Sequence, residues 1–266
     1  LDQPRQQRHK QRTRHRWGSP RRPEVAAHLA ANGLLPAICF VFSRKGCEEA
    51  ARSVLESGLR LTNRDERTQI RAIVQRHVSH LGREDLEALG FERFSAGLEA
   101  GVASHHAGMV PPFKEAVEAC FVAGLVKLVF ATETLALGIN MPARSVVIES
   151  LSKFTGEHHE DLTPSQYTQL TGRAGRRGLD PVGHALVLWS PWQGFDTVAA
   201  LASSREFVLR SAFQPTYNMV VNLVLRYDRD RAHELLGLSF AIALAAASFL
   251  PLKGRKRRRV PVETWG

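Results

Sequence analysis

The sequence predicts an α/β protein built on a doubly wound, mostly parallel sheet, and two observations predict it. Short apolar runs of the kind that form strands covered on both faces recur at residues 37–42, 101–104, 126–131, 145–149 and 184–189. Helical patterns lie between them, at residues 45–57, 112–124 and 164–174. Strands that alternate with helices form parallel sheets, because each crossover helix returns the chain to the same edge.

The segment before the first strand divides into two parts. Residues 1–22 are rich in Arg, Gln and His and predict a disordered basic tail. Ordered structure is expected to begin near Pro23, with a short helix from Glu24 to Asn32 that ends at Gly33. We expect this helix to lead directly into the first strand.

Two further segments lie outside the alternation of strands and helices. Residues 62–100 are polar and helical, with Thr62 and Asp65 at capping-box spacing, and predict an insertion. After Pro191 the pattern is helical, most clearly at residues 206–209 and 217–227. The expected domains are a basic tail over 1–22, an α/β domain over 23–190, a smaller helical unit over 191–250 and a basic tail over 251–266.

The net charge of +10 comes from the two ends of the chain. Residues 1–22 contribute +7 and residues 253–263 contribute +5, which leaves the rest of the chain near −2. The tails could hold phosphates loosely, or they could be solvated ends without a role. The folded part is therefore not expected to carry a strongly basic face.

Composition excludes several classes of protein. Cys39, Cys47 and Cys120 lie in apolar or helical stretches without ligand spacing, which indicates buried, reduced thiols rather than a disulfide framework. No apolar run reaches the roughly 18 residues that a membrane span needs, and no signal-peptide core lies near the start. We expect a cytoplasmic protein with no membrane partner.

The strongest chemical signal is the segment Gln169-Leu-Thr-Gly-Arg-Ala-Gly-Arg-Arg-Gly178. Thr163, followed by Pro164 and Gln166, predicts a helix that starts here and runs into the arginines. Arg173 and Arg176 are three residues apart, so we expect them to project from the same side of a helical turn.

This segment suits the binding of a polyphosphate. Gly172, Gly175 and Gly178 remove side chains that would block the close approach of a phosphate or another backbone. Two planar guanidinium groups can bind a polyphosphate with paired hydrogen bonds and neutralise charge that develops on a γ-phosphate. The alternative is a solvated basic helix end, but the spacing of glycines and arginines is more specific than that.

A second segment, residues 130–144, delivers a polar turn at the end of a buried strand, where open α/β sheets bind ligands. Thr132 and Thr134 offer hydroxyl groups, Gly138 allows close approach of a backbone, and Asn140 can donate or accept a hydrogen bond. A strand and turn without a ligand is the alternative.

Two shorter segments follow other strands. Ser43 and Arg44 stand before a helix, where a hydroxyl and free amides suit a phosphate, although serine is more often only a helix cap. His105, His106 and Gly108 lie in a loop that precedes another helix. No cysteine or carboxylate stands at ligand spacing from these histidines, so we expect no metal site.

Together these segments resemble the motifs of superfamily 2 helicases of the Ski2-like kind. Residues 169–178 are similar to motif VI, 130–144 to motif V, 40–49 to motif IV and 104–109 to the HHAG element of that family. The resemblance covers about residues 23–240, in the form of the actinobacterial enzymes, and implies a C-terminal RecA-like domain. It ends after Phe240, for which a frameshifted or truncated gene is one explanation.

The resemblance also implies a role for each residue. The arginine fingers of ATP hydrolysis would be Arg173 and Arg176. The residues at the nucleotide would be Gln169, Glu133, Gly138 and Asn140. The nucleic-acid backbone would be contacted by Ser43, Arg44, His105, His106, Gly108, Thr132 and Thr134.

Two other parts of the chain match features of the family. His158 and His159 lie between motifs V and VI, where the family has a hairpin that helps to part strands; an ordinary surface hairpin is the alternative. Residues 209–219 resemble the entry to a winged-helix domain, with Tyr217 and Met219 expected to pack in its core.

The sequence contains neither a GxxxxGK[ST] loop nor a DExH carboxylate pair after a strand, which ATP hydrolysis needs. We therefore expect the second motor domain of an ATP-dependent, 3′-to-5′ RNA or DNA helicase, inactive alone. ATP and Mg would be bound jointly with a first RecA-like domain. The alternatives are a non-catalytic module that binds nucleic acid or a partner, and a gene fragment. Contacts to the backbone do not distinguish RNA from DNA.

Overall fold

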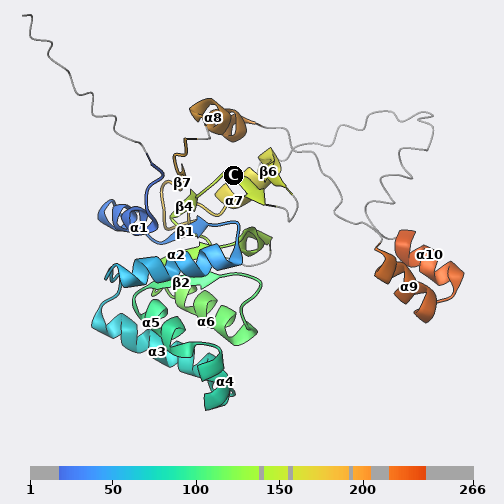
Figure 1. Ribbon diagram of the computed structural model, residues 1–266, viewed down its shortest axis with the longest axis horizontal. Helices are drawn as coiled ribbons and strands as arrows, with labels where there is room; N and C mark the ends of the chain where they lie inside the picture. Colours follow the sequence, from blue (N-terminus) through green and yellow to red (C-terminus); the bar gives the residue numbers. More distant parts are fainter. Residues whose placement is uncertain (1–17, 138–140, 155–157, 192–193, 205–215, 238–266) are drawn as a thin grey trace, which may run out of the picture. The chain divides into compact units, whose positions relative to one another are not determined.

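Five parallel strands form the sheet of the larger of two units, residues 1–206, and residues 207–266 form the smaller (Figure 1). The computed structural model describes residues 18–137, 141–154, 158–191, 194–204 and 216–237. In order across the sheet the strands are β2 (Val102–His105), β3 (Leu128–Ala131), β1 (Ala37–Phe40), β4 (Ser145–Ile148) and β7 (His184–Val187). Every neighbouring pair is parallel, which confirms the predicted fold class.

Apolar side chains cover both faces of this sheet. Alternate residues of a strand point to opposite faces, so Ile38 and Phe40 join one apolar cluster while Ala37 and Cys39 join the other. All residues of β1, β3 and β4 are buried. A strand covered on both faces has no solvent side, which explains the uninterrupted apolar runs in the sequence.

Helices supply the cover on each face. The face of Cys39 packs against α1 (Arg22–Ala31) and α2 (Arg44–Glu56). The opposite face packs against α3 (Arg64–Val78), α5 (Phe91–Glu99), α6 (Pro111–Val122) and α7 (Pro164–Thr171). Together with the short α4 (Arg83–Ala88), helices α3 and α5 form the predicted insertion, grouped at the β2 end of the sheet in Figure 1.

The start of the insertion corrects one prediction. Asn63, not Thr62, caps α3: its side-chain oxygen accepts from the Glu66 amide at 2.9 Å, and the Glu66 carboxylate accepts from the Asn63 amide at 2.8 Å. The Thr62 hydroxyl instead donates to the carbonyl of Glu99. The capping box therefore begins one residue later than predicted.

The beginning of α1 shortens the predicted basic tail. Arg22 is the first residue of α1, and its Nε and Nη2 donate to the two carboxylate oxygens of Glu149 at 2.9 and 3.2 Å. Arg21 caps the helix and pairs with Glu24. Both arginines thus belong to the fold, and residues 1–17 lie outside the described residues.

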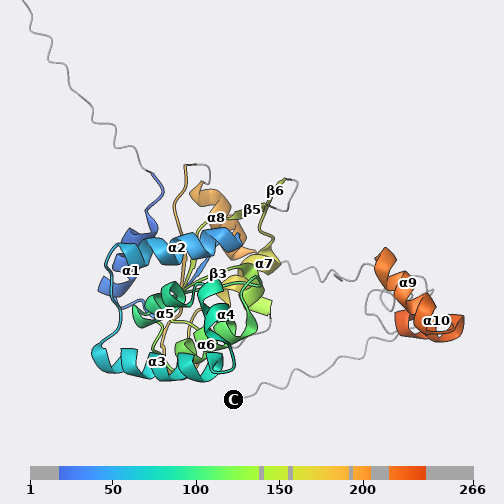
Figure 2. The same cartoon turned by 60° about the horizontal axis from the view of Figure 1, so that its bottom comes forward.

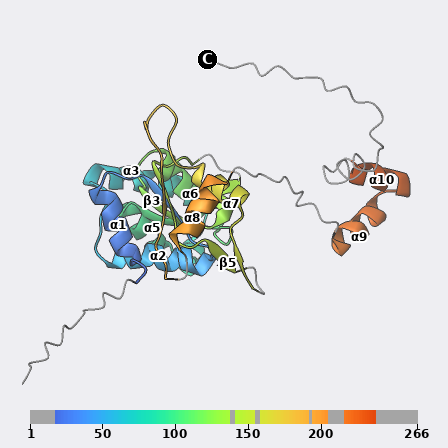
Figure 3. The ribbon, with the colours of Figure 1, turned by 90° about the horizontal axis from the view of Figure 1, so that it is seen from above.

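A hairpin and one further helix complete the larger unit. Strands β5 (Ser152–Phe154) and β6 (His159–Asp161) pair antiparallel and extend from the body in Figure 2, which fits the hairpin expected around His158 and His159. Phe154 is 57% exposed, with its ring 5.3 Å from that of His159. Helix α8 (Phe195–Ser203), which the sequence did not predict separately, packs beside α7 (Figure 3).

The smaller unit contains two described helices, α9 (Tyr217–Arg226) and α10 (Arg229–Gly237). Helix α9 matches the predicted helix at residues 217–227, but Tyr217 is 88% exposed in this unit rather than buried in a core. The helix predicted at 206–209 lies outside the described residues.

The cysteines are buried and free of disulfides, as predicted. Burial raises the pKa of the Cys47 thiol to about 12 and that of Cys120 to about 11, so both are protonated at neutral pH. No described helix has the length and apolar character needed to cross a membrane.

Candidate functional site

Strands β1, β2 and β3 end side by side, and we call this side of the sheet the carboxyl edge. The register pairs Phe40 and His105 with Ala131, so the three strands stop at the same level. The chain then continues into Ser43, His106 and Thr132. The fold thus brings together the residues expected to contact nucleic acid, although they are far apart in the sequence.

Ser43 is the N-cap of α2 and is exposed. Its hydroxyl oxygen accepts a hydrogen bond from the Gly46 amide at 3.0 Å, which leaves the hydroxyl hydrogen able to donate. A Cβ on Gly46 would lie 2.5 Å from that oxygen and 2.9 Å from a methyl of Val41. A side chain at position 46 would therefore force the side chains of Ser43 and Val41 to shift.

Arg44 and Gly108 meet beside Ser43. A Cβ on Gly108 would lie 3.2 Å from Cδ of Arg44 and 3.3 Å from Nδ1 of His106, so the loop after β2 packs closely against the arginine. Both Arg44 and Gly108 are exposed. The pair presents a guanidinium group and a bare backbone to solvent at the carboxyl edge.

The side chains of His105 and His106 are buried, only 2% and 3% exposed, so neither ring faces solvent at the carboxyl edge. Nε2 of His105 lies 2.8 Å from Oε1 of Glu118 on α6, and Nε2 of His106 lies 3.1 Å from Oε1 of Glu48 on α2. The two rings therefore tie the end of β2 to the helices on either side of it.

Burial also fixes the protonation of these rings. Desolvation is the main cause that lowers the pKa of both histidines, and it outweighs the opposing effect of Glu118 on His105 and of Glu48 on His106. The Gly108 amide donates to Nδ1 of His106 at 3.2 Å, so the neutral ring carries its proton on Nε2 and donates it to Glu48. Nδ1 of His105 has no partner among the described residues.

Thr132, Glu133 and Thr134 follow β3 at the same edge. The two threonine hydroxyls lie 2.9 Å apart, and Thr134 is exposed. The Glu133 carboxylate accepts from Nζ of Lys153 on β5 at 3.0 Å, so Glu133 is already paired with a cation. Gly138 and Asn140, expected at the nucleotide, lie outside the described residues.

A cavity of about 390 Å³ adjoins this edge between α2, α5 and β2, beside Gly108 and Met109. Its rim carries the cations Lys45, Arg52 and Arg93, and also Glu48 and Glu49. Since charges of both signs line the cavity, it offers no distinct anion site.

The arginine segment lies at the opposite edge of the sheet, where β4 begins. Helix α7 starts as predicted, because Thr163 and Gln166 form a capping box. It ends at Thr171, with Gly172 as its C-cap, so Arg173 and Arg176 do not share a helical turn as predicted. They lie in a turn over residues 172–178, which we call the arginine turn. Gln169 is exposed on the last turn of α7.

Backbone contacts hold the arginine turn against the segment that precedes β4. The Ala143 amide donates to the carbonyl of Arg173 at 2.9 Å, and the Gly175 amide donates to the carbonyl of Ala143 at 2.7 Å. Gly175 has φ +89°, a conformation that favours glycine. A Cβ on Gly183 would lie 2.6 Å from backbone atoms of Ala174 and Gly175, so the chain passes through here without side chains.

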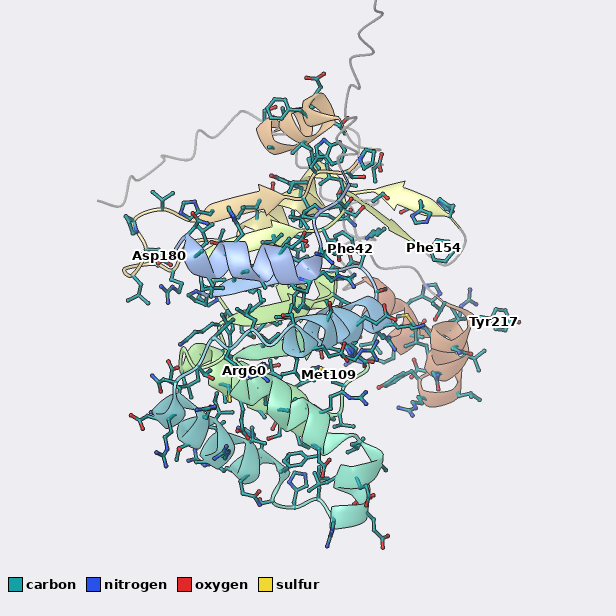
Figure 4. The ribbon with its side chains drawn as sticks, turned by 60° about the vertical axis from the view of Figure 1, so that its left-hand side comes forward. Phe42, Arg60, Met109, Phe154, Asp180 and Tyr217 are labelled. Atoms are coloured by element: carbon teal, nitrogen blue, oxygen red, sulfur yellow. The ribbon has the colours of Figure 1, made fainter. Side chains whose placement is uncertain are left out.

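Asp180 binds two arginines at this turn. Nε and Nη2 of Arg176 donate to its two carboxylate oxygens at 2.7 and 2.9 Å, and Nε of Arg144 donates at 3.0 Å. The Arg176 guanidinium holds the pKa of the Asp180 carboxyl well below its usual range, with further contributions from the Arg176 amide and Arg144. Met109 lies in the loop after β2, at the carboxyl edge, and Figure 4 shows Asp180 well apart from it.

The chain matches known proteins over most of its length. The model of the helicase conserved C-terminal domain matches residues 50–178. The chain is 58% identical over 222 residues to the probable helicase HelY of Mycobacterium tuberculosis, and 37% identical over 225 residues to the antiviral helicase SKI2 of Saccharomyces cerevisiae. The chain belongs to the Ski2-like helicases.

The chain spans only about a quarter or less of the length of the relatives it matches. The HelY match covers 84% of the chain but 24% of HelY, and the SKI2 match covers 82% of the chain but 17% of SKI2. A further relative, 37% identical over 219 residues, is the DExH-box ATP-dependent RNA helicase DExH11 of Arabidopsis thaliana; that match covers 80% of the chain and 16% of DExH11. The higher identity to the mycobacterial protein agrees with the expected actinobacterial form.

Sequence reasoning missed three residues of this Ski2-like domain. Asp180 follows the arginine segment by two residues, and only its buried, fully hydrogen-bonded carboxylate distinguishes it from an ordinary loop residue. Lys153, 16% exposed, pairs with Glu133 across two elements, a contact that no local pattern indicates. Gly183 could have been suspected, because a glycine directly before a strand often marks a close approach.

Proposed function

We propose that this chain is the second motor domain of an ATP-dependent helicase, with Arg173 and Arg176 as its arginine fingers. The observation that carries the proposal is the arginine turn, which is held by the backbone of Ala143 and by the carboxylate of Asp180. Cationic groups fixed in advance stabilise charge that develops on a transferring phosphoryl group without the cost of reorganising.

The carboxyl edge is the proposed site for single-stranded RNA or DNA. Ser43 and Thr132 can donate hydroxyl hydrogens to phosphate oxygens, and Arg44 supplies a positive charge beside the bare backbone of Gly108. Such contacts address the backbone and are the same for every sequence. They suit a motor that moves along a strand.

The segment between Thr132 and Ala143 links the two proposed sites. It starts at the carboxyl edge after β3 and continues through the short helix η1 (Glu133–Leu137), which packs on α7. At its other end Ala143 forms the bridge to the arginine turn. A shift of Thr132 on nucleic-acid binding would therefore reach the arginine turn through the packing of η1 on α7, the helix that ends at this turn.

ATP and Mg would be bound jointly with a first RecA-like domain. The sequence contains no GxxxxGK[ST] loop to hold the phosphates and no DExH carboxylates to hold the metal, whereas the arginines suit the opposite side of a nucleotide. The name of the Arabidopsis relative, an ATP-dependent RNA helicase, supports ATP as the energy source. In this arrangement neither half hydrolyses ATP alone.

The test is complementation of ATPase activity. The purified chain is assayed with and without a first RecA-like domain of a Ski2-like helicase, in the presence and absence of single-stranded RNA or DNA. We expect turnover stimulated by nucleic acid only when both proteins are present. If the mixture binds nucleic acid but never hydrolyses ATP, the chain is a binding module and the proposal fails.

A further inference from the structure

The Asp180 carboxylate accepts hydrogen bonds from two arginines with both of its oxygens. It accepts from the amide, Nε and Nη2 of Arg176 and from Nε of Arg144, and its side chain is fully buried. These four hydrogen bonds match the roughly four lone-pair sites of a carboxylate. Asp180 therefore has no capacity left to bind a metal or a substrate, and its role is to hold the arginines.

The bonds to Asp180 use only one edge of the Arg176 guanidinium. Nε and Nη2 face the carboxylate, and no described residue bonds Nη1. The side chain of Arg176 is 27% exposed. Because the guanidinium is planar and rigid, fixing one edge also fixes the direction of the remaining donors. Arg176 is thus held in one orientation with donors left for an oxyanion.

Arg144 anchors the carboxylate to the rest of the domain. Its Nη1 donates to the carbonyl of Gly33 at 2.6 Å, and its amide donates to the carbonyl of Pro36 at 2.9 Å, in the segment that leads from α1 to β1. Its own carbonyl accepts from the amide of His184, the first residue of β7, at 3.1 Å. Asp180 is therefore fixed relative to two strands of the sheet, and two arginines on one carboxylate leave a net positive charge.

We infer that Asp180 is a positioning residue for Arg176, braced by Arg144, and that it sets the direction in which Arg176 reaches the γ-phosphate. The inference rests on the proposed function of Arg176 as an arginine finger. Without Asp180 the long side chain would sample several rotamers, and the bound nucleotide would have to order it in each catalytic cycle. The effect therefore falls on the chemical step rather than on nucleotide binding.

The experiment uses the full chain complemented with a first RecA-like domain, with ATPase as the readout. Asp180→Asn keeps the size of the side chain but turns an amide donor toward the donors of Arg176. We expect kcat to fall by about 10- to 100-fold, with the KM for ATP changed by less than about threefold. In an Arg176→Ala background, Asp180→Asn should change kcat by no more than about twofold, because the group that it positions is absent.

Two further variants complete the design. Glu99→Gln breaks the ion pair with Arg71 in the insertion, 2.6 Å long, and is expected to leave kcat unchanged. Arg144→Gln removes the brace but keeps the pair between Arg176 and Asp180, so we expect a smaller loss of kcat that also vanishes in the Arg176→Ala background. Thermal unfolding shows whether Asp180→Asn folds. If it does not fold, Arg144→Gln tests the inference in its place.

The outcomes separate the inference from the proposed function. If Arg176→Ala itself leaves kcat unchanged, the finger assignment is wrong. If Arg176→Ala abolishes turnover while the folded Asp180→Asn variant keeps wild-type kcat, the positioning role is overturned and the proposed function stands. A further outcome is that Asp180→Asn lowers kcat equally in the wild-type and the Arg176→Ala background. That result would overturn the positioning role, because it would indicate a general structural defect.

Discussion

Gly175 donates its backbone amide to the carbonyl of Ala143 at 2.7 Å, and this contact joins two segments that are far apart in the sequence. The Ala143 amide in turn donates to the carbonyl of Arg173 at 2.9 Å. The peptide groups on both sides of Ala174 are therefore fixed by the segment that leads into β4. The end of α7 also contributes, because the amides of Arg173 and Ala174 donate to the carbonyls of Leu170 and Thr171 at 3.2 and 2.9 Å.

Gly183→Ala tests the close packing of this turn. The new Cβ would lie 2.6 Å from the carbonyl of Ala174 and the amide nitrogen of Gly175, and these backbone atoms cannot move without breaking the bridge. We expect the free energy of unfolding, measured by urea denaturation, to fall by about 1 to 3 kcal/mol.

A matched control for Gly183 lies in α8. Gly194 is the N-cap of that helix, with φ −71° and open space around the position of a Cβ, and serine caps helices as well as glycine does. Gly194→Ser should leave stability within about 0.5 kcal/mol of wild type. Equal stability of the two variants would show that Ala174 and Gly183 are not packed as described.

The sheet and the start of α7 were predictable because their signals are local. Buried parallel strands appear as apolar runs, and the Thr163 and Gln166 pair is a capping box in sequence as in structure. The end of α7 was not predictable, because it depends on pairing with Ala143.

The burial of two residues of the candidate site was not predictable for the same reason. His105 and His106 resemble exposed loop residues until Glu118 on α6 and Glu48 on α2 are seen beside them. Thr62 and Asn63 each have an acidic residue three positions later, so the sequence offers two capping boxes. The contact of Thr62 with Glu99, at the far end of the insertion, decides between them.

The buried histidines predict a stability that depends on pH. Burial is the main cause that lowers the pKa of His105 and His106 in the folded state. Nearby positive charges lower it further: Lys114 and His106 for His105, and Arg44 and Lys114 for His106. The carboxylates of Glu118 and Glu48 act in the opposite direction. In the unfolded chain both histidines have the ordinary histidine pKa of 6.5, so they bind protons at a higher pH than in the folded chain. Stability is fully present above pH 6.5 and falls as the pH drops from there toward the folded pKa values.

Urea denaturation between pH 8 and pH 5 measures this effect. Each histidine contributes a slope of at most about 1.4 kcal/mol per pH unit. Carboxyl groups with lowered pKa, such as Glu66 and Glu99, add to the slope only near pH 5, and they do so equally in wild type and in a histidine variant. His105→Asn should reduce the slope. An unchanged slope in that variant would mean that His105 does not resist protonation in the folded chain.

Binding of single-stranded RNA should depend mainly on the charged ends of the chain. Residues 18–252 carry a net charge of zero, whereas residues 1–17 and residues 253–266 carry +5 each. Binding by such ends releases counterions, and the slope of log K against log salt grows by about 0.7 for each phosphate neutralised.

A fragment over residues 18–252 is the comparison for this salt titration, since it keeps Arg22 and its ion pair with Glu149. Removing residues 1–17 and 253–266 should flatten the slope and leave weak binding through the carboxyl edge. If the fragment keeps the full affinity and slope, the folded part carries a basic groove that the charge count does not reveal.

The kcat of Arg176→Ala in the complemented motor decides whether Arg176 is an arginine finger. An arginine finger acts on the transition state, so the account predicts that kcat falls by about a thousandfold or more while the KM for ATP changes little. Arg173→Ala should behave alike, and the double variant should lose far less than the product of the single losses, because the two groups act as a unit. Near-normal turnover of Arg176→Ala would contradict the account.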